Sequence, residues 1–155
     1  MILYLETSRL VKLYFDEDGS AETRGLVAAA DVTAVSIVAY AEARATFARK
    51  RIEQRIEDDA FKRAREDFER DWSRTYILEA TDRIIRSAGD LAEKHGLRGF
   101  DAIHLASALA LRLPQRALGP FRPPRPEGPP ADGGPAIVFC TADKRLAAAG
   151  RAEGL

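Results

Sequence analysis

Short apolar runs separated by longer mixed segments organise the sequence. Four runs, at residues 2–5, 32–35, 76–78 and 136–140, are rich in branched or aromatic side chains and short enough to be buried strands. Between them, apolar residues recur at helical spacing, most clearly at every fourth position from residue 52 to residue 72 amid dense mixed charge. Strands that alternate with helices predict an α/β fold with a parallel sheet covered on both faces.

Polar residues and a glycine mark the expected helix ends. Thr7 or Ser8 is placed to cap a helix after the first strand, Ser36 a helix after the second, and Thr81 a helix after the third. Gly96 follows the helical pattern IIRSAGDLAEKH, where a left-handed residue commonly ends a helix. We therefore expect each strand to lead into a helix.

A proline-rich segment interrupts this alternation. All eight prolines of the chain lie within residues 114–135, and proline disrupts both helices and central strands. We expect this segment to be an exposed loop. At 155 residues the chain is large enough to bury a core of its own. We expect a single domain over residues 1–155, with no second independent domain.

The balance of charge limits how the chain can meet nucleic acid. Lys and Arg number 24 and Asp and Glu also number 24, so the formal net charge is zero and no global field attracts a polyanion. Acidic residues interleave the basic ones between positions 49 and 65, which favours a solvated helix with ion pairs over a basic stripe. Any contact with nucleic acid must therefore come from a local patch.

Cysteine usage and hydropathy indicate the compartment. The single cysteine, Cys140, excludes an internal disulfide and lies in the run AIVFC, where it is interpreted as a small buried residue. The first residues lack the features of a secretory signal, and no uncharged apolar run is long enough to span a bilayer. We expect a soluble, cytoplasmic protein with no membrane partner.

Four acidic residues lie in short apolar stretches and carry the candidate chemistry. They are Glu6 in LYLETS, Glu42 in AYAEAR, Asp101 in GFDAIHLASAL and Asp143 in FCTADKRL. Burying carboxylates without partners is costly, so a fold that gathers several of them generally binds a cation between them. Oxygen ligands without a thiolate cluster favour Mg²⁺ or Mn²⁺. Glu6 and Asp143 also follow two predicted strands, where parallel sheets place their sites.

Each acid also has a structural interpretation, which the sequence leaves open. Asp101 precedes an apolar helix and could be its N-cap, while Asp143 lies in a first helical turn that favours negative charge. Glu42 could pair with Arg44 on the same helix. His104, three positions after Asp101, is interpreted as a packing histidine whose hydrogen bonds are satisfied rather than as a ligand. The joint pattern, and no single residue, points to a metal site.

Four segments of the sequence form a pattern: LYLETSRLVKLYF, SIVAYAEARATF, LRGFDAIHLASALAL and VFCTADKRLAAAG. In this order they resemble the PIN domain family, most closely the VapC-type ribonuclease toxins of bacterial and archaeal toxin–antitoxin pairs. The resemblance implies a three-layer α/β/α PIN-like domain with a central, mostly parallel sheet. It also implies a metal-dependent endoribonuclease that hydrolyses RNA phosphodiester bonds, a small cognate antitoxin as partner, and a homodimer.

Carried over residue by residue, the resemblance implies a catalytic and metal-binding cluster for Mg²⁺ or Mn²⁺. Its members are Glu6, Glu42, Asp101 and Asp143. Glu6 and Asp101 are expected to be the principal ligands. Asp143 is expected to bind directly or through water, and Glu42 to act as a ligand or as an orienting base.

The chain departs from the family pattern beside the first acid. The family usually carries aspartate at the position of Glu6 and a small residue at the position of Arg9. Ser8 and Thr141 are candidate polar helpers of the cluster. The departures leave open a PIN-fold module that binds RNA or protein with weakened catalysis. A phosphotransfer enzyme or receiver domain fits poorly, because no aspartate pair follows the first strand.

Overall fold

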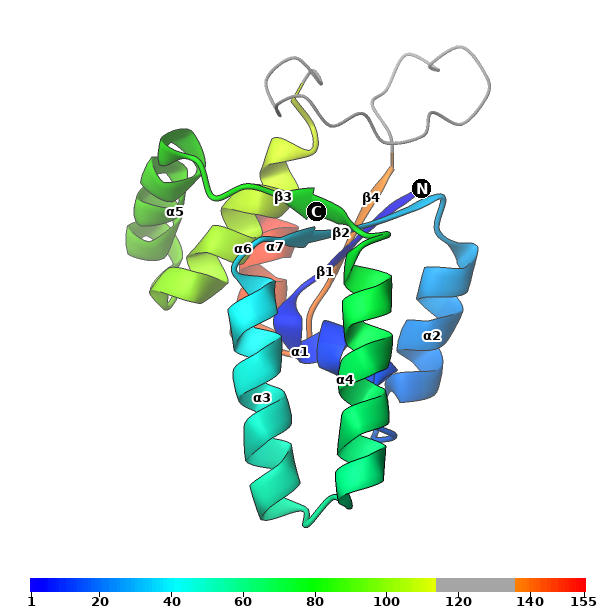
Figure 1. The fold of residues 1–155 in the computed structure, drawn as a ribbon. Helices are drawn as coiled ribbons and strands as arrows, with labels where there is room; N and C mark the ends of the chain where they lie inside the picture. The colour runs from blue at the N-terminus through cyan, green and yellow to red at the C-terminus, as the bar shows by residue number, and fades with distance from the viewer. Residues whose placement is uncertain (114–135) are drawn as a thin grey trace.

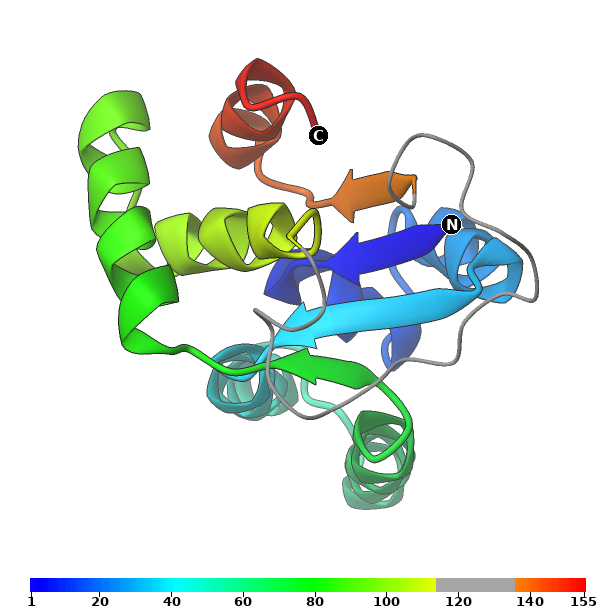
Figure 2. The same cartoon turned by 90° about the horizontal axis from the view of Figure 1, so that it is seen from above.

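Four parallel strands form the sheet at the centre of the computed structural model, which describes residues 1–113 and 136–155. The strands are β1 (Ile2–Leu5), β2 (Val32–Ser36), β3 (Tyr76–Leu78) and β4 (Ile137–Cys140), arranged in the order β3-β2-β1-β4. All three neighbouring pairs are parallel, and Figure 2 shows the strands side by side in this order. The predicted parallel sheet is confirmed. The predicted proline-rich loop, residues 114–135, lies outside the described residues.

Helices cover both faces of the sheet (Figure 1). Helices α1 (Thr7–Leu10), α2 (Ser20–Ala29), α3 (Ala39–Glu53) and α4 (Asp58–Trp72), with the short 3-10 helix η1 (Val11–Leu13), pack on one face. Helices α5 (Asp82–His95), α6 (Gly99–Ala110) and α7 (Lys144–Ala152) pack on the other. The predicted three-layer α/β/α arrangement is therefore confirmed. Among the described residues, no helix combines the length and apolarity needed to cross a membrane.

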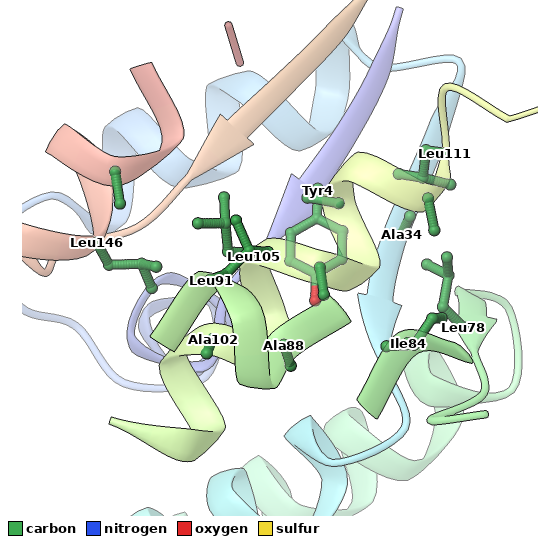
Figure 3. Packing of buried hydrophobic residues seen from close by; sticks show 14 of the residues in the cluster. Tyr4, Ala34, Leu78, Ile84, Ala88, Leu91, Ala102, Leu105, Leu111 and Leu146 are labelled. Atoms are coloured by element: carbon green, nitrogen blue, oxygen red, sulfur yellow. The ribbon is translucent and has the colours of Figure 1, made fainter. Parts of the chain in front are cut away.

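Side-chain alternation along β1 explains the two layers. Leu3 and Leu5 point into the core shared with α3 and α4, whereas Tyr4 points into the core shared with α5 and α6. All three residues are fully buried. Figure 3 shows Tyr4 among Leu91 and Leu105 of these helices. A central strand buried on both faces carries few polar residues, which is why the first apolar run was readable in the sequence.

Two predicted helix ends are confirmed. Thr81 caps α5, because its hydroxyl oxygen accepts a hydrogen bond from the Ile84 N–H. Gly96 ends the same helix with φ of 62°, in the left-handed region that glycine adopts without strain. The boundaries of α5 could be predicted because both signals are local in the chain.

Two other predicted caps are wrong. The N-cap of α1 is Glu6, whose side chain accepts from the Ser8 N–H, so neither Thr7 nor Ser8 takes this role. Ser36 is the last residue of β2 and its buried hydroxyl has no hydrogen-bond partner among the described residues. Helix α3 begins three residues later, after Val38. Thr7 is already the first residue of α1, and Ser36 still belongs to the strand, so neither hydroxyl occupies the N-cap position.

Candidate active site

The carboxyl ends of β1 and β4 form the edge where the predicted acids gather. Leu5 is paired with Cys140, so the next residues, Glu6 and Thr141, leave the sheet together. The Glu6 N–H donates to the Cys140 carbonyl at 3.0 Å. β1 has β2 on one side and β4 on the other, and such a change of direction in strand order is where parallel α/β sheets bind ligands.

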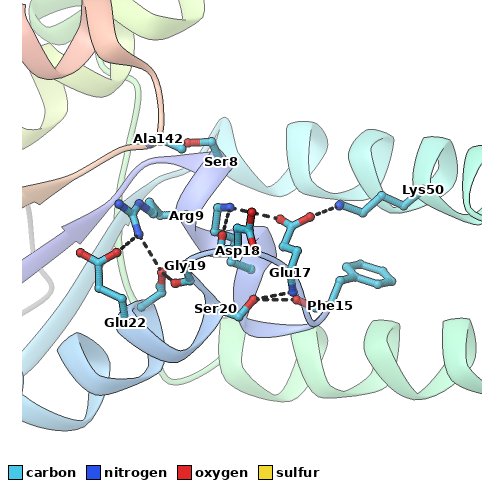
Figure 4. Close-up of polar contacts among 12 residues, drawn as sticks. Ser8, Arg9, Phe15, Glu17, Asp18, Gly19, Ser20, Glu22, Lys50 and Ala142 are labelled. Carbon is cyan, nitrogen blue, oxygen red and sulfur yellow. Dashed lines mark hydrogen bonds and ion pairs between the residues drawn. The ribbon is translucent and has the colours of Figure 1, made fainter.

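Glu6 is largely buried and both of its carboxylate oxygens accept hydrogen bonds. Oε1 accepts from the Ser8 N–H at 3.0 Å, and Oε2 accepts from the hydroxyls of Ser8 and Thr141, the latter at 2.9 Å. The Ser8 hydroxyl oxygen also accepts from the Ala142 N–H at 2.9 Å (Figure 4). Both candidate helpers therefore lie against Glu6 and connect the end of β1 to the end of β4.

Asp143 caps α7 and is linked to the same group. Its Oδ1 accepts from the Leu146 N–H at 2.8 Å, and its own N–H donates to the Thr141 hydroxyl at 3.0 Å. The carboxylate therefore does stabilise a helix start, as one interpretation of the sequence held. The shared Thr141 hydroxyl also links Asp143 to Glu6.

Asp101, in the first turn of α6, lies close enough to Asp143 and Glu6 for their charges to act on it. It is not the N-cap, a position occupied by Arg98, so the cap interpretation is wrong. Burial raises the pKa of Asp101, and the negative charges of Asp143 and Glu6 raise it further. Three carboxylates from three separate segments therefore concentrate negative charge in one place.

Glu42 of α3 belongs to a neighbouring polar group. Its Oε2 accepts from the Thr7 hydroxyl at 2.7 Å and lies 2.7 Å from Nε2 of His104. Burial raises the pKa of Glu42, but the hydrogen bonds from His104 and Thr7 outweigh burial and bring this pKa below its ordinary value. Arg44 instead pairs with Glu69 at 2.7 Å, so the predicted alternative partner of Glu42 is wrong.

Comparison with known proteins identifies the family of this chain. The profile of the PIN domain matches residues 3–152. The chain belongs to the PIN domain family. This PIN domain is 32% identical over 153 residues to ribonuclease VapC45 of Mycobacterium tuberculosis (strain CDC 1551 / Oshkosh) and equally to ribonuclease VapC49 of Mycobacterium tuberculosis (strain ATCC 25618 / H37Rv). Each alignment covers 99% of this chain and 92% of the relative. The predicted family is confirmed.

The PIN domain also brings to Glu42 residues that the sequence analysis did not place in the site. His104 is fully buried and hydrogen-bonded, as a packing histidine should be, yet its partner is one of the predicted site acids. Tyr4 of β1 and Thr7 of α1 complete this group. The only signal in the sequence was the three-residue spacing from Asp101, which places His104 on the same face of α6.

Arg9 points away from the acidic cluster of this PIN domain. Its guanidinium donates to Glu22 of α2 at 2.7 Å and to the Thr23 hydroxyl at 3.4 Å. Figure 4 shows the side chain directed at Glu22. Arg9 therefore neutralises an acid of α2 instead of one of the four candidate site acids.

The chemistry of the donors fits the divalent cation that the resemblance implies. Carboxylate and hydroxyl oxygens are hard ligands of the kind that Mg²⁺ and Mn²⁺ prefer. Burial, and then the charges of Asp143 and Glu6, raise the pKa of Asp101, and a bound cation would favour its charged form. In residues 1–113 and 136–155, no three side chains of Asp, Glu, His or Cys form a ready metal-binding group. The charges of these acids therefore act on one another, but among the described residues their side chains do not form a complete set of metal ligands.

Proposed function

We propose that this PIN domain is a metal-dependent endoribonuclease that hydrolyses RNA phosphodiester bonds and is the toxin of a VapBC-type toxin–antitoxin pair. The observation that carries the proposal is the approach of Asp101 on α6 to Glu6 and Asp143, the acids that follow β1 and β4. Burial and the negative charges of these two acids raise the pKa of Asp101. Two relatives that align over nearly the whole chain bear the name ribonuclease, which agrees with this proposal.

Each residue has a proposed role. Glu6 and Asp101 would hold Mg²⁺ or Mn²⁺, Asp143 would bind it directly or through water, and Glu42 would act as a ligand or an orienting base. Once bound, the metal would neutralise charge on the phosphodiester and lower the pKa of a bound water. The chain's own hydroxyls would fix the acids: Thr141 would orient Glu6 and Thr7 would orient Glu42.

The acidic cluster also sets the order of binding. A phosphodiester is anionic, so the three clustered carboxylates repel it when no cation is present. The net charge of zero supplies no compensating attraction. We therefore expect both the affinity for RNA and the rate of cleavage to depend on the divalent metal.

Three further parts of the proposal come from the relationship with VapC toxins. A small cognate antitoxin would bind and inhibit the nuclease, the active form would be a homodimer, and the protein would act in the cytoplasm. These parts are independent of the metal chemistry and need their own measurements.

A PIN-fold binding module with weakened catalysis is the second candidate. The hydrogen bonds that occupy both oxygens of Glu6 favour it, because a metal would have to share that carboxylate with Ser8 and Thr141. Affinity for a divalent metal separates the two candidates.

The deciding experiment incubates the purified chain, freed of any bound partner, with structured and single-stranded RNAs in Mg²⁺, Mn²⁺ or EDTA. Asp101→Asn removes one charge of the cluster, and Asp90→Asn, an exposed acid on α5, is the matched control. Cleavage that requires metal, is lost in Asp101→Asn and persists in Asp90→Asn supports the nuclease. RNA binding without cleavage under any metal would instead favour the binding module.

A further inference from the structure

Two buried side chains and one half-buried carboxylate, from three distant elements, form a continuous hydrogen-bonded row. The Tyr4 hydroxyl of β1 lies 2.9 Å from Nδ1 of His104 on α6, and Nε2 of His104 lies 2.7 Å from Oε2 of Glu42 on α3. Thr7 closes the row, since its hydroxyl lies 2.7 Å from Oε2 of Glu42 and 3.1 Å from Nε2 of His104. Nothing in the proposed chemistry above uses Tyr4.

The chemistry of the end group fixes the direction of the hydrogen bond between His104 and Glu42, and the tautomer of the ring sets the direction of the bond to Tyr4. A carboxylate only accepts, so the short contact requires the hydrogen on Nε2 of His104. A neutral imidazole with its hydrogen on Nε2 has a lone pair on Nδ1, and this lone pair accepts from the Tyr4 hydroxyl. The Thr7 hydroxyl donates to Glu42, while its oxygen accepts a share of the Nε2–H hydrogen.

The Tyr4 and His104 end of this row is buried, whereas its Glu42 end reaches solvent. Tyr4 and His104 are fully buried, whereas the Glu42 side chain is 29% exposed. A buried donor or acceptor that loses its partner is costly, so the row resists rearrangement. Both donors reach Oε2, and within the described residues no hydrogen bond is made to Oε1 of Glu42. Oε1 is thus the oxygen left for a metal or a water.

We infer that Tyr4 and His104 are positioning residues, which hold Glu42 through Oε2 and present Oε1 to the reacting centre. This inference rests on the proposed nuclease function for its catalytic meaning, and on the hydrogen bonds alone for its structural meaning. Partners of this kind, one step behind a ligating carboxylate, typically change metal affinity or activity by about 10- to 100-fold when they are removed.

The first experiment tests the hydrogen bonds without any activity assay. The chain has two histidines, so ¹⁵N spectra of the imidazole rings are simple, and His104→Gln assigns the signals. We expect the His104 ring to carry its hydrogen on Nε2, with Nδ1 unprotonated. A hydrogen found on Nδ1, alone or in addition to the one on Nε2, would contradict the hydrogen bond from Tyr4 to Nδ1. This outcome does not depend on whether the protein cleaves RNA.

The second experiment tests the effect on Glu42. Tyr4→Phe removes only the hydroxyl and keeps the ring stacked on Phe139, whose centroid lies 5.6 Å away. His104→Met removes the donor, and His104→Gln returns an N–H close to the position of Nε2. We expect Mn²⁺ affinity to fall by about 10- to 100-fold in His104→Met. At saturating Mn²⁺, kcat should fall by a similar factor with KM for RNA unchanged, and both losses should recover in part in His104→Gln. Tyr4→Phe should show a smaller loss of both.

The control for this series is Tyr14→Phe. Tyr14 also donates its hydroxyl hydrogen to an acid, Asp71, at 3.3 Å, but this acid lies on α4 and outside the site. Its removal should leave Mn²⁺ affinity and kcat unchanged. The Tyr4 and His104 variants could instead show lower melting temperatures with unchanged Mn²⁺ affinity and kcat. This result would mean that both residues serve only in packing, and it would refute the inference. A wild-type chain that neither binds Mn²⁺ nor cleaves RNA would refute the proposed function. The ¹⁵N spectra of the imidazole ring would still test the hydrogen bonds from Tyr4 through His104 to Glu42.

Discussion

The Thr141 hydroxyl donates a hydrogen bond to Oε2 of Glu6 at 2.9 Å, across 135 positions of the chain. It lies where β4 and β1 end together. Because Glu6 is largely buried and charged, this bond belongs to the stronger class of hydrogen bonds, those made to an ionised group. It joins the two halves of the acidic cluster.

Thr141→Val should therefore weaken both the fold and the site. The substitution keeps the shape of the side chain and removes the hydroxyl, and a bond to a charged group contributes about 1.5–3 kcal/mol. We expect a loss of unfolding free energy of about that size in urea titrations, together with weaker Mn²⁺ binding by calorimetry. Thr141→Ser, which keeps the hydroxyl, is the control and should recover most of the Mn²⁺ affinity. Equal losses in the two variants would mean that the methyl group, and not the hydroxyl, matters.

Glu6→Asp tests whether the pocket is built around the longer acid. Aspartate is the residue that the resemblance led us to expect here, but it withdraws the carboxylate by one methylene from the Thr141 hydroxyl. Since both oxygens of Glu6 are held by donors placed for glutamate, we expect the variant to bind Mn²⁺ less tightly and to cleave RNA more slowly. Faster cleavage with tighter Mn²⁺ binding would show that glutamate strains the site.

Asp101→Asn should leave the metal-free fold intact and slightly more stable at neutral pH. The folded-state pKa of Asp101 is raised by burial and by its acidic neighbours, so its charged form opposes folding above that pKa. This penalty disappears as the pH falls through the raised pKa, because the wild-type carboxyl then becomes neutral as well. The difference in melting temperature between variant and wild type should therefore shrink on acidification. Added Mn²⁺ should raise the melting temperature of the wild type and not that of the variant; a variant less stable than the wild type at neutral pH without metal would contradict this account.

Gly150→Ala tests the packing of α7 on β4. A Cβ at Gly150 would lie 2.8 Å from Cδ1 of Phe139, whose ring stacks on Tyr4. Overpacking of this kind costs about 1–3 kcal/mol, which urea titrations would detect. Gly89→Ala on α5 is the matched control, because no heavy atom lies within 4 Å of its added Cβ. In that helix interior, alanine should stabilise the fold by about 0.5–1 kcal/mol.

The sheet and part of the site could be predicted because their signals are local. A strand buried on both faces leaves an unbroken apolar run, and an acid directly after such a run lies at the carboxyl end of the sheet. This logic placed Glu6 and Asp143 correctly relative to β1 and β4. The cap and the C-terminal glycine of α5 were readable for the same reason.

The remaining features depend on contacts between distant residues. Arg9 follows Glu6 by three positions in the sequence, but its guanidinium pairs with Glu22 of helix α2. His104 lies 62 positions from Glu42, and no pattern within one helix could reveal that α3 would meet it. The strand order decides both outcomes, and it follows from packing rather than from local propensity.

The pairing of β1 with β4 has a consequence for how the protein is made. The ribosome synthesises β1 first and β4 last of the four strands. One edge of β1 therefore stays unpaired until β4 has been synthesised. An incomplete chain that stops before Thr141 carries Glu6 without the hydroxyl that orients it and without Asp143. Since the proposed ribonuclease activity needs Glu6 and Asp143 together, an incompletely translated chain would lack that activity.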